Sequence, residues 1–239
     1  MSYATHSRFG TGYSAVATSE NSFVIGSQKA WRGERKPLVY CHGSGGTATT
    51  AVTNPAEINL LKALAQDYLV IAADLALQAW GNDNHLARIG DAVSHLANFN
   101  ADGPVTLVAG SMGNLGAFGY LKANPTGVRA IAGIIPCVDL DSVYPMATAD
   151  INAAYGGAYN TNTHGPVRSP VRYATELNAD VPVHLFTASN DTLTLPSTAT
   201  AFVAARPQTE RTNLGALGHT NEAVTASITP TVNWLKTLP

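Results

Sequence analysis

The chain has 239 residues, a length that suits one domain with a substantial core. Its 14 basic and 16 acidic residues give a formal net charge of −2 without a basic cluster, so we expect no nucleic-acid partner and no anionic membrane surface as partner. No apolar run approaches the roughly 20 residues that span a bilayer. The first residues lack the apolar centre of a secretion signal, so the default expectation is a cytoplasmic protein.

The first 36 residues are polar and glycine-rich and predict only short elements at a sheet edge. Alternating apolar residues in 13–17 and 22–25 indicate two short strands, and the charged stretch 29–36 indicates a turn. The first strongly buried strand is 38–41. It leads into a loop over 42–46 that contains three glycines.

The next segment predicts a helix, a strand and a second helix. Asn54 is the expected cap of the first helix, Pro55 takes its first position, and Glu57 is expected to close a capping box. A second buried strand covers 68–74, and apolar residues at helical spacing over 86–96 indicate the following helix.

The central stretch of the chain is 105–116. Aliphatic and β-branched residues over 105–109 read as a buried strand; a glycine, a serine at Ser111 and another glycine follow, and a helical pattern then begins. That helix ends at the turn 124–127, and 129–137 is another buried strand.

Regularity is lost over 139–180, which has several tyrosines and prolines and is too long for a simple connection. A strand over 182–188, a helix over 195–205 and a short strand over 212–217 follow. The closing helix is expected to kink or restart at Pro230.

This alternation predicts the α/β class: one domain over 1–239, built as a three-layer sandwich. A mostly parallel, twisted sheet of about eight strands is covered by helices on both faces. The segment 139–180 is the one insertion in this pattern.

The sequence Ala109-Gly110-Ser111-Met112-Gly113 resembles the nucleophile elbow of the α/β-hydrolase family, with alanine at the first position of the usual G-x-S-x-G. The steric reason is that Ser111 must sit on a strained strand-to-helix turn, where a side chain at 109 or 113 would collide with its neighbours. In this family, an insertion such as 139–180 is commonly a cap or lid over the active site.

The family's chain order is serine, then acid, then histidine. His219 follows a predicted strand and precedes a helix, where the family's base resides, and Asp191 follows the strand 182–188. Asp139 and Asp141 are rivals for the acid, because some members take it from the preceding strand. Asp180 lies at the wrong end of its strand.

An oxyanion hole needs two backbone N–H groups. One is expected from Met112, and the other from Ser44 in His42-Gly43-Ser44-Gly45-Gly46, which resembles the family's His-Gly-x-Gly loop. His42 is expected to brace this loop. The same glycines also fit a dinucleotide fingerprint, but the next helix starts well after them and Asp74 lies too far along the chain.

No histidine or cysteine pair has the spacing of zinc ligands, and no acidic calcium loop occurs, so no metal and no cofactor is expected. Cys41 and Cys137 are expected to be buried free thiols. Trp80 and Tyr144 are candidate substrate-binding residues, with surface or cap packing as the alternative for each.

Taken together, the resemblance implies a serine hydrolase that cleaves small carboxylic esters through a Ser111–His219–Asp191 triad. The alternatives are a thioester or amide hydrolase and a non-catalytic binding module on the same fold. The low charge and the composition resemble compact phage-encoded or actinobacterial hydrolases. Neither the natural substrate nor the oligomeric state follows from the sequence.

Overall fold

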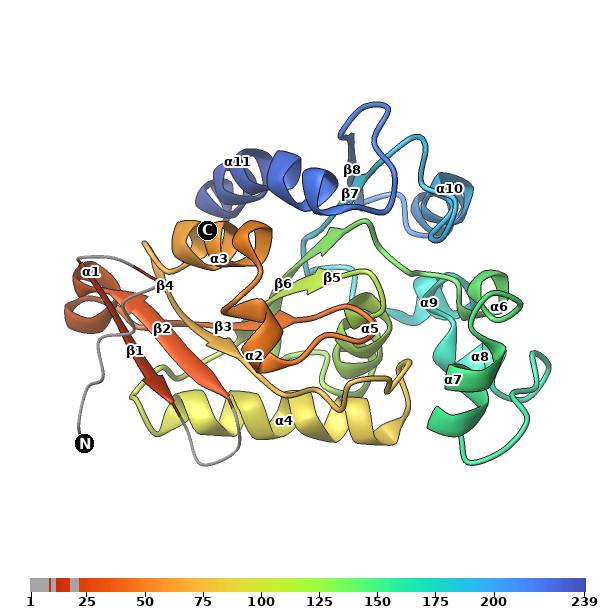
Figure 1. Ribbon diagram of the computed structural model, residues 1–239, viewed down its shortest axis with the longest axis horizontal. Helices are drawn as coiled ribbons and strands as arrows, with labels where there is room; N and C mark the ends of the chain where they lie inside the picture. Colours follow the sequence, from red (N-terminus) through yellow and green to blue (C-terminus); the bar gives the residue numbers. More distant parts are fainter. Residues whose placement is uncertain (1–8, 10–11, 18–21) are drawn as a thin grey trace.

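A single eight-stranded sheet organises the molecule (Figure 1). The computed structural model describes residue 9, residues 12–17 and residues 22–239. In spatial order the strands are β1 (Tyr13–Ala17), β2 (Phe23–Ser27), β4 (Tyr68–Ala72), β3 (Lys36–Cys41), β5 (Val105–Gly110), β6 (Val128–Ile134), β7 (Val183–Thr187) and β8 (Glu210–Asn213). Strands β1 and β2 run antiparallel to their neighbours, and all pairs from β4 to β8 are parallel. The predicted mostly parallel sheet is confirmed.

Helices cover both faces of this sheet. The larger helices α3 (Pro55–Leu64) and α11 (Asn221–Thr237) lie on one face and α4 (Asp83–Ala97), α5 (Gly113–Ala123) and α10 (Pro196–Ala205) on the other. Side chains of each strand alternate between the two layers: Leu107 and Ala109 of β5 pack on the α4 side, and Val108 packs on the α3 side. The three-layer arrangement follows from this alternation.

Three element predictions differ from the structure. The stretch 29–36 contains a short helix, α1 (Gln28–Arg32), because the Ser27 hydroxyl accepts a hydrogen bond from the Ala30 N–H and caps it. Strand β8 ends at Asn213, so most of 212–217 is loop. In addition, α11 continues through Pro230 as one helix without restarting.

The helix α3 begins where expected, but its first turn is built differently. The Asn54 side chain accepts a hydrogen bond from the Ala56 N–H at 3.0 Å, and a small preceding helix, α2 (Ala48–Ala51), holds the capping box instead. The Asn54 N–H donates to Thr50 O at 2.8 Å, so Glu57 does not close a capping box with Asn54.

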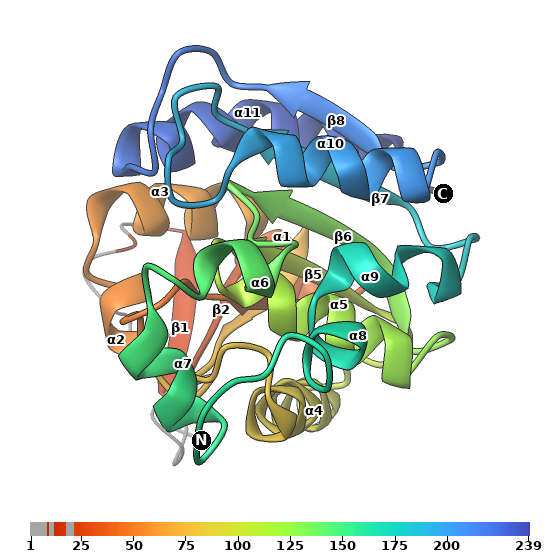
Figure 2. The ribbon, with the colours of Figure 1, turned by 90° about the vertical axis from the view of Figure 1, so that its right-hand side faces the viewer.

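The segment 139–180 folds into short helices beside the sheet. They are α6 (Leu140–Val143), α7 (Thr148–Ala154), α8 (Gly165–Arg168), α9 (Pro170–Tyr173) and the 3₁₀ turn Ala174–Glu176. Figure 1 shows α6, α7 and α8 grouped at one end of the molecule, and Figure 2 views them from that side. Leu140, Val143 and Ile151 pack there on Met112 and Leu115 of the central turn and helix. A lid role for the segment stays a prediction.

Candidate active site

Ser111 sits on a strained turn between β5 and α5. Its backbone φ is +47°, in the left-handed region that costs a non-glycine residue about 1–3 kcal/mol. The turn is fixed to the end of β6, because the Ser111 N–H donates to Ile134 O at 3.0 Å and Ser111 O accepts from the Cys137 N–H at 3.1 Å.

The residues flanking Ser111 differ in how much space they have. A Cβ on Gly113 would lie 2.3 Å from the carbonyl oxygen of Cys41, so only glycine fits there. Position 109 does hold a methyl group, which is fully buried in the core on the α4 side of the sheet. The expected collision therefore applies to 113 and not to 109.

The structure brings Ser111, His219 and Asp191 together. His219 lies in the loop 214–220 between β8 and α11, and its Nε2 is 2.9 Å from Ser111 Oγ. Its Nδ1 is 2.8 Å from Asp191 Oδ2, in the turn after β7. The rival carboxylates are engaged elsewhere: Asp139 accepts a hydrogen bond from the Ser169 hydroxyl, and Asp141 pairs with Arg172 at 2.5 Å.

Asp191 is only 3 % exposed, and both oxygens of its carboxylate accept hydrogen bonds. Oδ1 accepts from the Leu193 N–H at 2.9 Å and the Thr194 N–H at 2.8 Å, and the Thr194 hydroxyl lies 2.7 Å from Oδ2. Burial acts to raise the pKa of Asp191, but the hydrogen bonds from His219 and Thr194 outweigh it, and the pKa is lowered. Asp191 is therefore ionised at neutral pH and can orient the imidazole.

Thr194 is a site residue that the sequence did not reveal. Besides Asp191, its hydroxyl lies 3.0 Å from the carbonyl oxygen of Ile135, which has a φ of +40° despite its branched side chain. Thr194 thus links the turn that carries the acid to the end of β6. Its position three residues after Asp191 was the available signal.

Two backbone N–H groups next to Ser111 are free of acceptors. Within the described part of the chain, neither the Met112 nor the Ser44 N–H donates a hydrogen bond. A Cβ on Gly43 would lie 3.3 Å from Ser111 Cβ, so the glycine loop comes close to the nucleophile. The side chain of Ser44 points to Gln78 Oε1, to which it donates at 2.6 Å.

His42 braces this loop as a neutral side chain. Its Nδ1 lies 2.9 Å from Gly43 O, and its Nε2 accepts from the Leu75 N–H at 3.2 Å. One tautomer, with the proton on Nδ1, satisfies both contacts. Burial lowers the pKa of His42 and so favours that neutral form.

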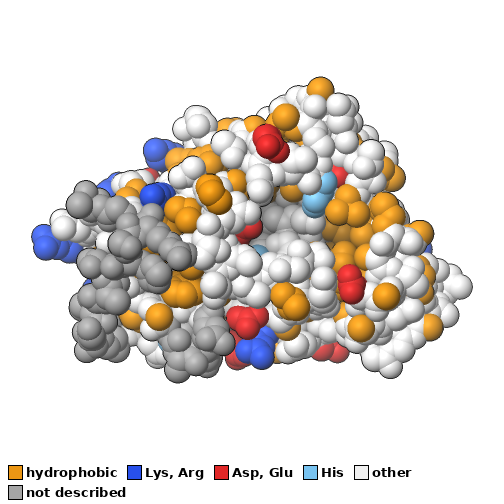
Figure 3. Space-filling view, in the orientation of Figure 1, with side chains coloured by type: hydrophobic (Ala, Val, Ile, Leu, Met, Phe, Trp, Pro, Cys, Tyr) orange, Lys and Arg blue, Asp and Glu red, His pale blue; other side chains and the backbone are white. Residues whose placement is uncertain are grey.

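A cavity of about 600 Å³ opens onto the Ser111 hydroxyl. The face drawn in Figure 3 shows a hollow with a histidine side chain exposed beside it. The lining residues come from the carboxyl ends of the strands, α3 and the start of α11; they are Tyr40, Gly43, Ser44, Glu57, Gly110, Ser111, Ile135, Leu193, His219, Thr220, Asn221, Glu222 and Val224. None comes from 139–180.

Trp80 and Tyr144 are not among the residues that line this cavity. Trp80 is 4 % exposed and packs with Met112 and Leu115 in the cluster beneath α6 and α7. Tyr144 packs on Tyr159, and its hydroxyl donates a hydrogen bond to Asn152 Oδ1. Their aromatic rings hold the short helices together, and this geometry gives no support for the expected substrate contact.

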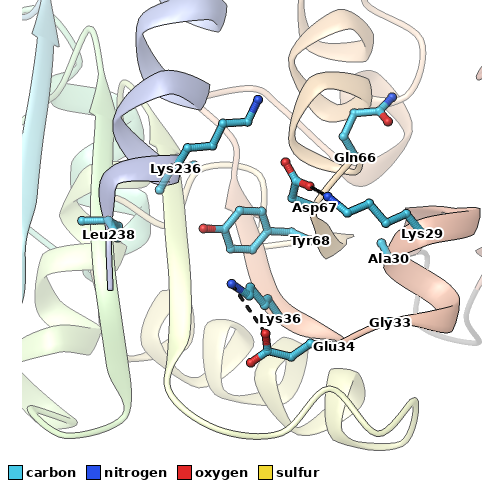
Figure 4. A pocket seen from close by; sticks show the side chains of 11 residues that line it. Lys29, Ala30, Gly33, Glu34, Lys36, Gln66, Asp67, Tyr68, Lys236 and Leu238 are labelled. Atoms are coloured by element: carbon cyan, nitrogen blue, oxygen red, sulfur yellow. Dashed lines mark hydrogen bonds and ion pairs between the residues drawn. The ribbon is translucent and has the colours of Figure 1, made fainter.

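A second cavity, of about 690 Å³, lies near the start of β3 and β4, at the opposite end of the parallel strands from Ser111 (Figure 4). Its charges are mostly paired, Lys29 with Asp67 and Lys36 with Glu34. None of its lining residues is a serine, cysteine or histidine, so it contains no serine–histidine or cysteine–histidine pair.

Across the described residues, no group of three or more histidine, cysteine, aspartate or glutamate side chains is placed to hold a metal ion. Cys41 and Cys137 are both buried and unpaired. Of the helices in the described ranges, none combines the length and apolar character that a membrane crossing requires.

The sequence matches no protein-family model, and no curated protein sequence matches it. Solved structures do match. An S-formylglutathione hydrolase from Agrobacterium tumefaciens superposes with a TM-score of 0.71 at 14 % identity, over 98 % of this chain and 97 % of that one. A truncated carbohydrate esterase from gut microbiota gives 0.74 at 12 % identity, over 99 % and 96 %. An esterase from Pyrococcus furiosus gives 0.70 at 15 % identity, over 100 % and 97 %.

These full-length superpositions and the strand order agree on one architecture. The chain has the α/β-hydrolase fold.

Proposed function

We propose that this α/β-hydrolase-fold protein is a serine hydrolase that cleaves carboxylic esters. The observation that carries the proposal is the unbroken series of contacts from Ser111 Oγ through His219 to Asp191, opening into a cavity. A serine hydroxyl needs a base, and the base needs an orienting acid. The esterases among the structural neighbours support an ester over other carboxylic derivatives.

In the proposed mechanism, Ser111 Oγ attacks the ester carbonyl carbon while His219 Nε2 accepts the hydroxyl proton. The carbonyl oxygen becomes an oxyanion, which receives hydrogen bonds from the N–H groups of Met112 and Ser44. His219 then protonates the leaving alcohol, and an acyl-enzyme remains on Ser111.

Hydrolysis completes the cycle. His219 takes a proton from water, the resulting hydroxide equivalent adds to the acyl carbon, and the returned proton restores the Ser111 hydroxyl as the acid leaves. Asp191 stays ionised throughout and stabilises the imidazolium. No cofactor enters these steps.

The test is covalent labelling with a fluorophosphonate, read by intact mass and peptide mapping. We expect one adduct per chain, on Ser111, and none on Ser111→Ala, with ester turnover reduced on the order of 10⁶-fold in that variant. Ser94→Ala removes an exposed serine on α4 and is the matched control. A folded wild-type protein that forms no adduct and hydrolyses no ester would refute the proposal and favour the binding module.

A further inference from the structure

The wall of the catalytic cavity contains a carboxylate that the proposed mechanism does not use. Glu57, on the first turn of α3, lines the cavity together with Ser111 and His219. Its sequence position fits a capping box, but the Asn54 N–H that such a box would offer to Glu57 donates to Thr50 O at 2.8 Å instead, so the carboxylate is not tied to the cap.

One oxygen of this carboxylate, Oε2, is buried and finds no hydrogen-bond partner among the described residues. Burial raises the pKa of Glu57, and its interaction with the neighbouring Tyr40 hydroxyl opposes the rise only in part. A carboxylate whose burial is not fully compensated by hydrogen bonds favours a positive charge nearby, because that charge stabilises its ionised form.

The remaining charges of the wall have the same sign. Glu222, at the exposed start of α11, is the second carboxylate, and the lining contains no lysine or arginine. The reaction itself makes His219 a transient cation, but Asp191 compensates that charge at 2.8 Å. A substrate in this cavity therefore meets a negative potential.

From this geometry we infer that Glu57 determines substrate charge: the cavity accepts esters that carry a cationic group and excludes esters that carry a carboxylate or phosphate. The inference rests on the proposed esterase function and adds a substrate class to it. A cationic group near Glu57 stabilises the ionised carboxylate through its charge, whereas an anion faces like-charge repulsion and desolvation at once.

The experiment uses three aryl acetates that differ only in the meta substituent: trimethylammonio, tert-butyl and carboxylate. The acetyl group is small and constant, so the three esters differ only in the charge carried by the aryl group. The readout is the ratio of kcat/KM for the cationic ester to kcat/KM for the anionic ester, which cancels any general loss of activity. Comparing this ratio between variants also cancels the intrinsic reactivity of each ester.

In Glu57→Gln we expect this ratio to fall about tenfold or more relative to wild type. Asp102→Asn removes the same charge from an exposed loop before β5, at the opposite end of that strand from Ser111, and we expect the wild-type ratio there. The wild-type ratio should also fall with added salt, a check that needs no variant. If Glu57→Gln does not fold, Glu57→Asp, which withdraws the carboxylate by one methylene, takes its place.

An unchanged ratio in a folded Glu57 variant, or a wild-type ratio that does not respond to salt, would overturn the inference. The neutral ester separates the two proposals. If wild type hydrolyses the tert-butyl ester and Ser111→Ala does not, the esterase function stands whatever the charge ratio shows.

Discussion

His85 gives the molecule a measurable sensitivity to acid. Its ring is fully buried between α4 and α5, where Nδ1 accepts a hydrogen bond from the Gly81 N–H at 3.2 Å. A Cβ on Gly116 would lie 2.5 Å from Nε2, so α5 leaves no room for a partner on that side. Burial, with a smaller effect from His42, lowers the pKa of His85 to about 3.

The sign of the effect follows from proton binding. The unfolded chain binds a proton on this histidine near pH 6.5, and the folded protein does so only near pH 3, so stability is lost as the pH falls between these values. The slope is about 1.4 kcal/mol per pH unit. Between pH 7 and pH 4.5 His85 should therefore remove about 2.5 kcal/mol from the free energy of unfolding.

The assay is urea unfolding of wild type and His85→Gln at pH 7, 5.5 and 4.5. Glutamine keeps an acceptor for the Gly81 N–H but does not titrate, and His42, His184 and Asp191 contribute equally to both proteins. Wild type should lose about 2.5 kcal/mol more than the variant over this range. Parallel pH profiles would show that His85 is not held neutral in the folded state, and the reasoning would fail.

Two further predictions concern the elbow and the acid. Gly113→Ala places a Cβ 2.3 Å from Cys41 O. We therefore expect the free energy of unfolding to drop by about 1–3 kcal/mol and fluorophosphonate labelling of Ser111 to slow about 100-fold. Labelling at the wild-type rate would contradict this prediction. Thr194→Val keeps the side-chain shape but removes the hydroxyl that donates a hydrogen bond to Asp191 Oδ2, so kcat should fall about tenfold. Thr194→Ser keeps the hydroxyl and should retain most of the wild-type kcat. Equal kcat values in the Val and Ser variants would show that the hydroxyl does not contribute.

The features that the sequence predicted well have local signals. The elbow is a buried strand followed at once by glycine and serine, and Asp191 and His219 each follow a strand of the parallel sheet, so the topology places all three at one edge. Contacts that depend on packing had no such signal. Glu57 satisfies a capping-box pattern, and only the bond from the Asn54 N–H to Thr50 O shows that its carboxylate does not close the box; its place in the cavity wall had no signal in the sequence.

The positions of the two aromatic residues that were expected to bind substrate also depend on packing. Tyr144 belongs to a segment without periodicity, and Trp80 to a loop, so neither sequence position indicates a direction. In the structure both rings pack among the short helices, and the Tyr155 hydroxyl donates a hydrogen bond to the Trp80 carbonyl oxygen. The start of β8 and the helix α1 were missed because both are short and consist largely of polar residues.

The two main-chain bonds that join Ser111 to the end of β6 have a consequence for how this protein can change. Main-chain bonds do not depend on side-chain identity, so the nucleophile keeps its position when residues around it are replaced. The wall residues Glu57 and Leu193 belong to other segments, α3 and the turn after β7. Substrate preference can therefore drift during evolution, or be redesigned, by exchanging wall side chains while the reactive atom stays in place.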